Sequence, residues 1–246
     1  MTILCIETST SVCSAAICKD GVPAEQCICR EGSNHARLLP RYIESLLLSA
    51  RQNGLVIEAV ALSEGPGSYT GLRIGTATAK GLCYGLNVPL VPVPTLAVLC
   101  EAARQQSAFS IQPSAVLCPM IDARRMEVYT ALYESGNLAE SAVRRDAHAV
   151  VVENEDSLLS FSAAIHCLSA KPVYYFGDGA AKCQSVLTHP DWHYLPDIVP
   201  EAQYMGTLAE QLMADGRQLT ANQIAYYEPY YLKEFVAAQS HVKGLK

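Results

Sequence analysis

The order of apolar runs and turns in the first half of this sequence is repeated in the second half. Each half begins with an apolar run that ends in a carboxylate and reaches a turn glycine 14 residues later, Glu7 with Gly21 and Asp122 with Gly136. From that glycine to the next glycine-x-glycine turn, the interval is 44 residues in the first half and 41 in the second. Landmarks repeated at matching intervals are typical of a duplicated unit, here predicted to have the order βββαβα.

Hydrophobic patterning predicts similar elements in both halves. Short apolar runs bounded by turn residues predict strands, and runs with three- to four-residue spacing predict helices. The strands are expected at 3–7, 12–18, 24–30, 59–63 and 89–93, and then at 116–121, 126–133 and 173–176. The helices are expected within 35–53, from the glycine-rich turn at 65–71 to about 86, from an N-cap at Thr95 to 105, and around 155–168 and 202–214.

Two such units predict an α/β fold in which helices pack on mixed sheets. We expect duplicated RNase H-like βββαβα units that form two lobes, residues 1–106 and 107–246, with a cleft between them. This architecture resembles the superfamily of actin, Hsp70 and the acetate and sugar kinases (ASKHA). The sequence leaves two points open: the structure of 143–156, and whether the helix near 202–214 packs on the second lobe or returns to the first.

Composition limits the classes of protein that the sequence fits. The chain has 246 residues, of which 50% are apolar and 17% charged, so it can bury a sizeable core. Its formal net charge of −6 disfavours independent nucleic-acid binding, because proteins of that class usually carry a basic patch. The chain has neither an apolar stretch of 18 residues nor a basic signal region. We therefore expect a cytoplasmic protein without a membrane segment, whose ten cysteines are free thiols.

The two equivalent carboxylates mark a candidate cleft. Glu7 and Asp122 each end a strand, and in the superfamily such acids can hold a metal ion or a nucleophilic water. A phosphate-binding loop needs glycine so that its N–H groups approach closely, whereas the turn after Glu7 has none. We therefore favour a vestigial cleft, whose acids cap turns or pair with Arg124 or Arg125. The residues assigned to this cleft are Glu7, Thr8, Ser9, Asp122, Gly177 and Gly179.

The segment from Gly65 to Gly71, Gly-Pro-Gly-Ser-Tyr-Thr-Gly, joins a predicted strand to a predicted helix. It lacks the lysine of a nucleoside-triphosphate P-loop, and its third glycine is one residue late for a dinucleotide-binding turn. The simpler interpretation is a tight turn followed by an N-cap at Ser68 or Thr70.

Two of the predicted helices have surfaces that suggest an interface. Gly71, Gly75 and Ala79 recur at every fourth residue, although each interior glycine costs a helix about 0.5–1 kcal/mol relative to alanine. The helix within 35–53 carries more apolar residues than one core stripe needs. A second interpretation, that both helices simply bury against their own sheet, stays open at this point. The predicted interface residues are Leu39, Tyr42, Ile43, Leu46, Leu47, Gly71, Gly75, Thr78, Ala79 and Leu82.

Several segments together resemble the TsaB (YeaZ) family of bacterial tRNA threonylcarbamoyladenosine biosynthesis proteins. They are 3–10, 35–40, 65–75, 121–124 and 127–129, with thinner matches at 177–179 and 229–233. The first-strand acid of the family is usually aspartate, whereas this chain has Glu7. The resemblance implies a scaffold subunit that pairs through its two interface helices with the paralogue TsaD and works with the ATPase TsaE. It also implies that homodimers form on the same surface and that tRNA is met only in the complex.

The resemblance further implies that a metal site has been lost. TsaD binds its metal through a His-x-x-x-His pair, whose positions correspond to Thr95 and Leu99 here. Leucine cannot ligate a metal, and a lone threonine is a poor ligand. We therefore expect no catalytic residue, no metal and no cofactor beyond weak nucleotide binding at the interface of the complex. The alternatives are a nucleotide-binding enzyme of the superfamily (a phosphotransferase or a metallopeptidase-like protein) and a stand-alone tRNA-binding protein.

Overall fold

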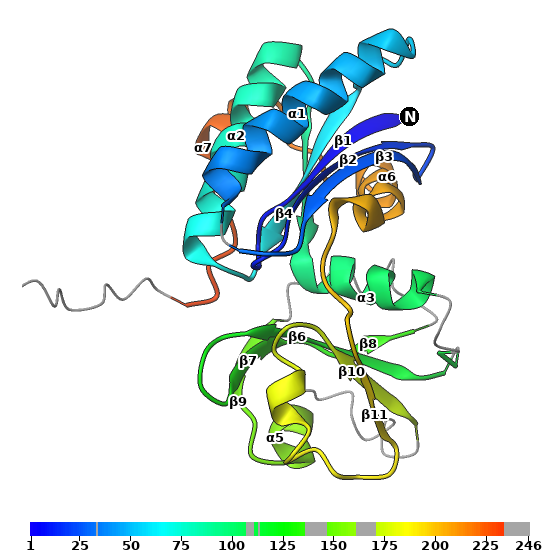
Figure 1. The fold of residues 1–246 in the computed structure, drawn as a ribbon, viewed down its shortest axis with the longest axis vertical. Coiled ribbons are helices and arrows are strands. Elements are labelled where there is room, and N and C mark those ends of the chain that lie inside the picture. The colour runs from blue at the N-terminus through cyan, green and yellow to red at the C-terminus, as the bar shows by residue number, and fades with distance from the viewer. Residues whose placement is uncertain (33, 107–110, 113, 136–146, 161–170, 234–246) are drawn as a thin grey trace, which may run out of the picture.

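The computed structural model folds the chain into two mixed β-sheets, one in each half of the molecule (Figure 1). It describes residues 1–246 except 33, 107–110, 113, 136–146, 161–170 and 234–246. The predicted turn at Gly136, the end of the helix predicted around 155–168, and Cys167 lie outside the described residues.

The first sheet is built from residues 2–94. Its strand order is β3-β2-β1-β4-β5, with β1 antiparallel to β2 and parallel to β4. β1 is buried along its whole length, because it is central in a sheet whose two faces are both covered. The strands are β1 (Thr2–Glu7), β2 (Cys13–Lys19), β3 (Val22–Cys29), β4 (Ala59–Gly65) and β5 (Leu90–Pro94).

The second sheet repeats the first strand for strand. Its order is β11-β10-β6-β7-β9, and β6 is antiparallel to β7 and parallel to β10, as β1 is to β2 and β4. This equivalence confirms the predicted duplicated α/β unit and places its third strand, β9, within 143–156. The strands are β6 (Val116–Asp122), β7 (Glu127–Thr130), β8 (Tyr133–Glu134), β9 (His148–Val151), β10 (Val173–Phe176) and β11 (Trp192–Leu195).

The single strand predicted at 126–133 is wrong in one respect, because the structure divides it into β7 and β8. β7 pairs with the end of β6 and β8 with its beginning, in one continuous register. Pro119 of β6 stands at the level of the interruption and has no N–H to donate. The ladder lacks a hydrogen bond there, and two short strands replace one long strand.

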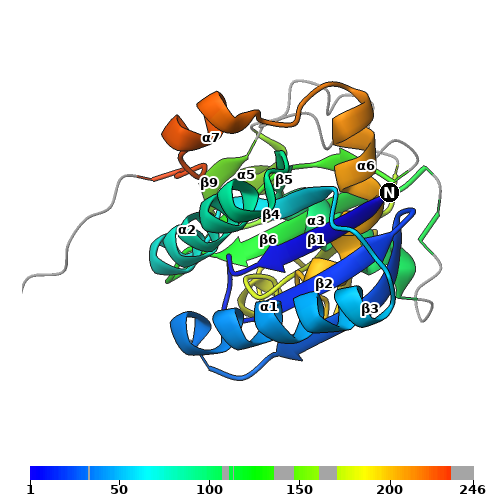
Figure 2. The ribbon, with the colours of Figure 1, turned by 90° about the horizontal axis from the view of Figure 1, so that it is seen from above.

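Two long helices cover one face of the first sheet (Figure 2). α1 (His35–Gln52) packs on β2 and β3, and α2 (Tyr69–Leu86) packs mainly on β4. Leu39, Ile43 and Leu46 of α1 enter the core between these helices and the sheet. Their spacing of three and four residues puts them on one face of the helix, which explains why this segment is helical here.

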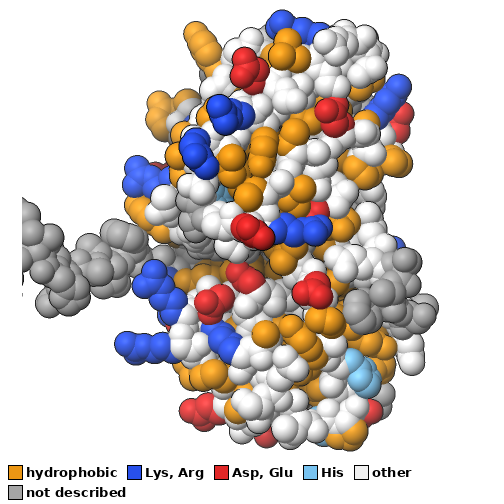
Figure 3. Space-filling view, in the orientation of Figure 1, with side chains coloured by type: hydrophobic (Ala, Val, Ile, Leu, Met, Phe, Trp, Pro, Cys, Tyr) orange, Lys and Arg blue, Asp and Glu red, His pale blue; other side chains and the backbone are white. Residues whose placement is uncertain are grey.

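α3 (Thr95–Gln105) lies at the junction of the two halves and contacts β4 of the first sheet and β6 of the second. Because neighbours cover it on both sides, residues 95–103 are all buried. Charged side chains of both signs gather on the surface where the two halves meet (Figure 3).

The last described helices return to the first sheet. α6 (Gly206–Ala214) packs on β1, β3 and β5, and α7 (Ala221–Tyr226) packs on α2. The buried carboxylate of Glu201 holds the returning chain, since it accepts hydrogen bonds from Arg30 at 2.6 Å and from Gln26 at 3.0 Å. This answers the question that the sequence leaves open for 202–214, whereas the division into residues 1–106 and 107–246 stays a prediction.

The helices that the structure describes on the second sheet are short. α5 (Glu155–Leu159) begins the segment predicted around 155–168. After the turn at 177–179, where the first unit has the 18 residues of α2, there is only a three-residue 3-10 helix, η2 (Ala181–Cys183). The predicted recurrence of a strand, a glycine turn and a helix is therefore correct for the strand and the turn, but not for a full helix.

Two predictions from composition concern the surface and the thiols. None of the helices within the described ranges has the length and hydropathy of a membrane span. The nine cysteines of those ranges are free thiols, as predicted; seven are buried, and Cys27 and Cys29 are half-buried.

Candidate functional site

Glu7 ends β1 with its carboxylate inside the protein. The side chain is fully buried, and Oε1 accepts a hydrogen bond from the Ser9 N–H at 2.6 Å. Oε2 has no hydrogen-bond partner among the described residues. Burial raises the pKa of this carboxyl above its ordinary value, and the hydrogen bonds from Ser9 oppose the rise. Glu7 is therefore a strained, locally bonded acid.

The loop after Glu7 is covered by the beginning of α2. The Ser68 N–H donates to the Ser9 carbonyl at 2.6 Å, and the Thr8 hydroxyl donates to the Gly71 carbonyl at 2.9 Å. A Cβ atom at Gly71 would overlap the Thr8 carbonyl oxygen. Thr8 and Ser9 are thus held by their own chain, and the glycines after β4 allow peptide to approach peptide where the phosphate-loop interpretation needs a ligand.

The turn between β4 and α2 follows the simpler interpretation of the Gly-Pro-Gly segment. Ser68 is the N-cap of α2, and its side chain accepts a hydrogen bond from the Gly71 N–H at 3.4 Å. The predicted cap is confirmed at Ser68, and Thr70 lies inside the first turn of the helix.

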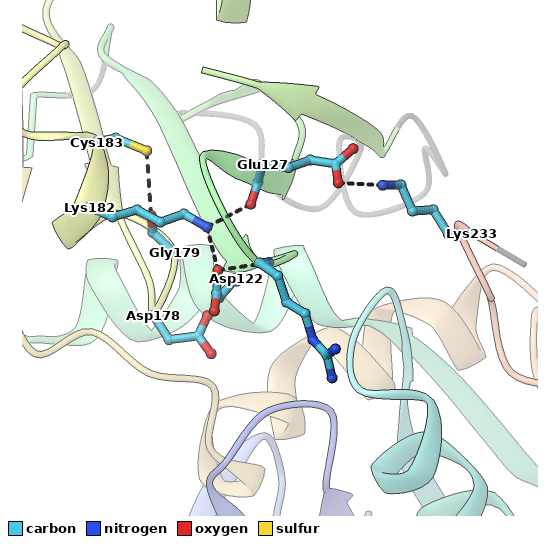
Figure 4. A network of polar contacts seen from close by, with 8 residues as sticks. Asp122, Glu127, Asp178, Gly179, Lys182, Cys183 and Lys233 are labelled. Atoms are coloured by element: carbon cyan, nitrogen blue, oxygen red, sulfur yellow. Dashed lines mark hydrogen bonds and ion pairs between the residues drawn. The ribbon is translucent and has the colours of Figure 1, made fainter. Parts of the chain in front are cut away.

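Asp122, the equivalent acid of the second unit, is half-exposed and ion-paired (Figure 4). Oδ1 accepts a hydrogen bond from the Arg124 N–H at 3.0 Å and contacts the Lys182 ammonium group. Lys182 also donates to the Glu127 carbonyl at 2.7 Å. The capped turn is as predicted, but the predicted pairing with an arginine side chain is wrong, because η2 brings Lys182 to this carboxylate instead.

Gly177 and Gly179 lie against the backbone at the end of β6. A Cβ atom at Gly177 would overlap the Met120 carbonyl oxygen, and one at Gly179 would stand 2.9 Å from the Asp122 nitrogen. Asp178, between the two glycines, accepts a hydrogen bond from the Asp122 N–H at 3.0 Å. Both glycines therefore serve close packing of this turn on β6, and the second half of the predicted cleft is filled by its own chain.

The two positions where the family's catalytic paralogue holds a metal lie in the core. Thr95 is the first residue of α3 and Pro94 is its N-cap, so the N-cap predicted at Thr95 is wrong. The Thr95 hydroxyl lies 2.6 Å from the Ser63 hydroxyl and accepts a hydrogen bond from the Gly65 N–H at 3.1 Å, which uses it within the subunit. Leu99 is fully buried and offers only alkyl groups. This donor set does not fit a metal ion.

Other metal-binding arrangements can be considered in the same way. Within the part of the chain that the structure describes, no group of three or more His, Cys, Asp or Glu side chains is placed to hold an ion.

Six of the ten predicted interface residues face inward. A Cβ atom at Gly75 would overlap the Thr8 hydroxyl, and Ala79 packs in the core of the first sheet. The interface assignment is wrong for these six side chains, because the glycine stripe fits α2 against β1 and β4 of its own subunit. The buried residues are Leu39, Ile43, Leu46, Gly71, Gly75 and Ala79, and the half-buried ones are Tyr42, Leu47, Thr78 and Leu82.

The outer surface of the same helices carries residues that the predicted set omits. Leu48 of α1 is 52% exposed and Tyr84 of α2 is 92% exposed. Gly81 and Gly85 are also exposed, and a Cβ atom at either would meet nothing within 4 Å. No contact within the described subunit requires these two glycines, whereas their cost to the helix is real.

Comparisons with known proteins place this geometry in context. The chain matches the family model described as "TsaD: tRNA N6-adenosine threonylcarbamoyltransferase" over residues 30–240. The tRNA threonylcarbamoyladenosine biosynthesis protein TsaB of Haemophilus influenzae is 28% identical over 239 residues, which cover 96% of this chain and 95% of the relative. The protein of the same name in Escherichia coli is 29% identical, with 96% of each chain covered.

The fold is similar to a solved structure as well. YeaZ from Pseudomonas aeruginosa superposes with a TM-score of 0.73 and 25% sequence identity, over 94% of this chain and 99% of that one.

Proposed function

Because the chain belongs to the TsaD family, and within it to the TsaB (YeaZ) branch, we propose that it is a non-catalytic partner subunit of TsaD. Its role is in tRNA threonylcarbamoyladenosine biosynthesis. In this proposal it works in the cytoplasm with TsaD and the ATPase TsaE. It supports transfer of the threonylcarbamoyl group to the adenosine beside the tRNA anticodon, and it has no cofactor of its own.

The observation that carries this proposal is the state of the two inherited metal positions. Thr95 and Leu99 are buried, and the hydroxyl of Thr95 already bonds within the subunit. A chain that keeps the fold without these ligands has lost the means to activate a substrate there. The ion-paired Asp122 and the covered loop after Glu7 support the same conclusion for the cleft.

The surface proposed for pairing with TsaD, or with a second copy, is the outer face of α1 and α2. Tyr42 and Leu82 are half-buried, and Tyr84 and Leu48 are exposed. Gly81 and Gly85 leave room beside them for a partner helix to approach closely. In a homodimer the same patch would face itself, as an isologous contact requires.

Reconstitution tests the proposal. TsaD, TsaE, threonylcarbamoyl-adenylate and an unmodified tRNA transcript are combined with and without this chain, and the modified nucleoside is measured by mass spectrometry. The proposal predicts transfer with TsaD and this chain together, much slower transfer with TsaD alone, and none with the chain alone. Equal rates with and without the chain would contradict it.

Calorimetric titration of the chain alone with ATP and magnesium separates the proposal from the enzyme alternative. Micromolar binding that is lost in the variant Glu7→Gln/Asp122→Asn would favour a nucleotide-binding enzyme.

A further inference from the structure

A groove of about 580 Å³ runs between α2 and the end of the described chain, on the edge of the molecule where Lys and Arg side chains gather (Figure 3). Its walls combine cations and aromatic rings from segments that are far apart in the sequence. The lining residues that carry charge or rings are Tyr69, Arg73, Lys80, Glu228, Tyr231 and Lys233.

The cations of the groove are held by neutral groups or by a carboxylate outside it. Arg73 donates to the Tyr69 hydroxyl at 2.9 Å, and Lys80 donates to the Ala225 carbonyl at 3.1 Å. Lys233 pairs with Glu127 of β7, which does not line the groove. Arg73 and Lys80 therefore keep charge and donors for an anionic ligand.

An aromatic wall stands beside these cations. The rings of Tyr69 and Tyr231 have their centroids 5.0 Å apart, and the Arg73 guanidinium lies over the Tyr69 ring at 5.4 Å from its centroid. Stacked rings capped by a guanidinium form a surface on which a nucleobase can stack.

A buried hydroxyl in the same groove lacks a partner. Thr76 lines the groove and is only 7% exposed, yet its Oγ1 atom has no hydrogen-bond partner among the described residues. A buried hydroxyl without a partner is unfavourable in a folded protein, and a polar ligand in the groove can relieve this cost.

This groove is separate from the proposed pairing surface. The residues of α2 that line it, such as Arg73, and those that face α1, such as Thr78, are offset by five positions, roughly 140° around the helix. α7 and the segment after it border the groove, whereas α1 borders the pairing surface. Both surfaces can therefore be occupied at the same time.

We propose that this groove binds an unpaired segment of tRNA, with Arg73 and Lys80 on backbone phosphates and the Tyr69–Tyr231 pair against a base. The inference rests on the proposed function, because it takes the RNA to be the substrate of the complex. A free acidic peptide would use the cations but not the ring faces. The net charge of −6 limits affinity outside this local surface, so the groove adds to the RNA contacts of TsaD rather than replacing them.

Fluorescence anisotropy with the complex of this chain and TsaD tests the groove. The probe is a labelled, unmodified tRNA transcript that has adenosine beside its anticodon. Arg73→Gln/Lys80→Gln should weaken binding about tenfold and reduce the slope of log K against log salt by about 1.4. Tyr69→Leu should weaken binding with an unchanged slope. The matched control is Lys19→Gln/Lys171→Gln, which removes the same charge outside the groove and should leave Kd unchanged.

Each outcome assigns the result. Equal losses in the control pair and the groove pair, or no loss in either, would overturn the inference. Displacement of the tRNA by AMP or by polyglutamate at equal concentrations of anionic groups would overturn it too, in favour of a nucleotide or an acidic peptide. Failure of the wild-type chain to join TsaD would instead count against the proposed function.

Discussion

Gly71 and Gly81 lie in one helix, and opposite needs keep each of them small. Gly71 faces the Thr8 carbonyl inside the subunit, whereas Gly81 faces open space. The sequence shows the spacing of small residues but not the direction in which they point. The stripe of Gly71, Gly75 and Ala79 was therefore predicted at an interface, although the structure uses it to fit α2 on its own sheet.

These two glycines make a matched pair of substitutions. Gly71→Ala should lower the free energy of unfolding by about 3 kcal/mol, because the new methyl group overlaps backbone that cannot move aside. Gly81→Ala should raise it by about 0.5–1 kcal/mol in the monomer, because an exposed helix position gains alanine. Urea unfolding measures both values, and equal effects at the two positions would contradict the assigned faces.

The buried carboxyl of Glu7 makes stability depend on pH. Burial raises its pKa in the folded state above the ordinary 4.5, so the folded protein binds more protons than the unfolded chain in that window. Its contribution to stability is present below the unfolded pKa and is lost as pH rises through the folded pKa.

Glu7→Gln should remove this loss. The variant should unfold at higher urea than the wild type at pH 8, and the difference should shrink as the pH falls toward 4.5. A wild-type advantage at pH 8 would show that the negative charge is stabilised by contacts other than those described above.

The elements themselves follow closely from the sequence. Apolar runs between turn residues predict β1 to β5, α1 and α2 well, since each element buries one face or the whole strand. The division of β7 from β8 depends on Pro119 across the ladder, and the reduction of the second helix to η2 depends on packing beyond it. Both effects come from neighbours in space, which local patterning does not contain.

The outer face of α1 and α2 gives a prediction at the scale of elements. Gly81→Leu should weaken pairing with TsaD at least about tenfold, because the side chain fills the space left for a partner, while the monomer keeps its stability. Gln211→Leu on the exposed side of α6 adds the same side chain elsewhere and should not change pairing. Sedimentation of mixtures with TsaD measures this, and tight pairing by Gly81→Leu would rule out this surface.

In the whole molecule, the duplication explains the two sheets, but the course of the C-terminal segment breaks the symmetry. α6 and α7 return to the first sheet, and the groove joins Arg73 to Lys233 across 160 residues. The sequence predicted neither the return nor the groove, because both depend on contacts between distant segments. The two-lobe architecture needed only the repeated intervals.

The clasp at Glu201 tests how firmly the returning chain is held. Arg30→Gln should lower the free energy of unfolding by about 1–2 kcal/mol, because it leaves a buried carboxylate with fewer donors, although Arg30 itself is 64% exposed. Lys171→Gln removes the more exposed ion pair with Glu134 and should cost at most about 0.5 kcal/mol. Urea unfolding of both variants measures the difference, and equal costs would contradict the assigned role of the clasp.

The central claim is that this subunit acts through its surfaces and not through an active site in its inherited cleft. The rate of threonylcarbamoyl transfer by TsaD and TsaE with the chain carrying Glu7→Gln and Asp122→Asn tests it most directly. With pairing to TsaD intact, the account predicts a rate within about twofold of the wild type, because neither carboxylate acts on substrate. A loss of about a hundredfold or more, the effect typical of removing a catalytic acid or base, would contradict it.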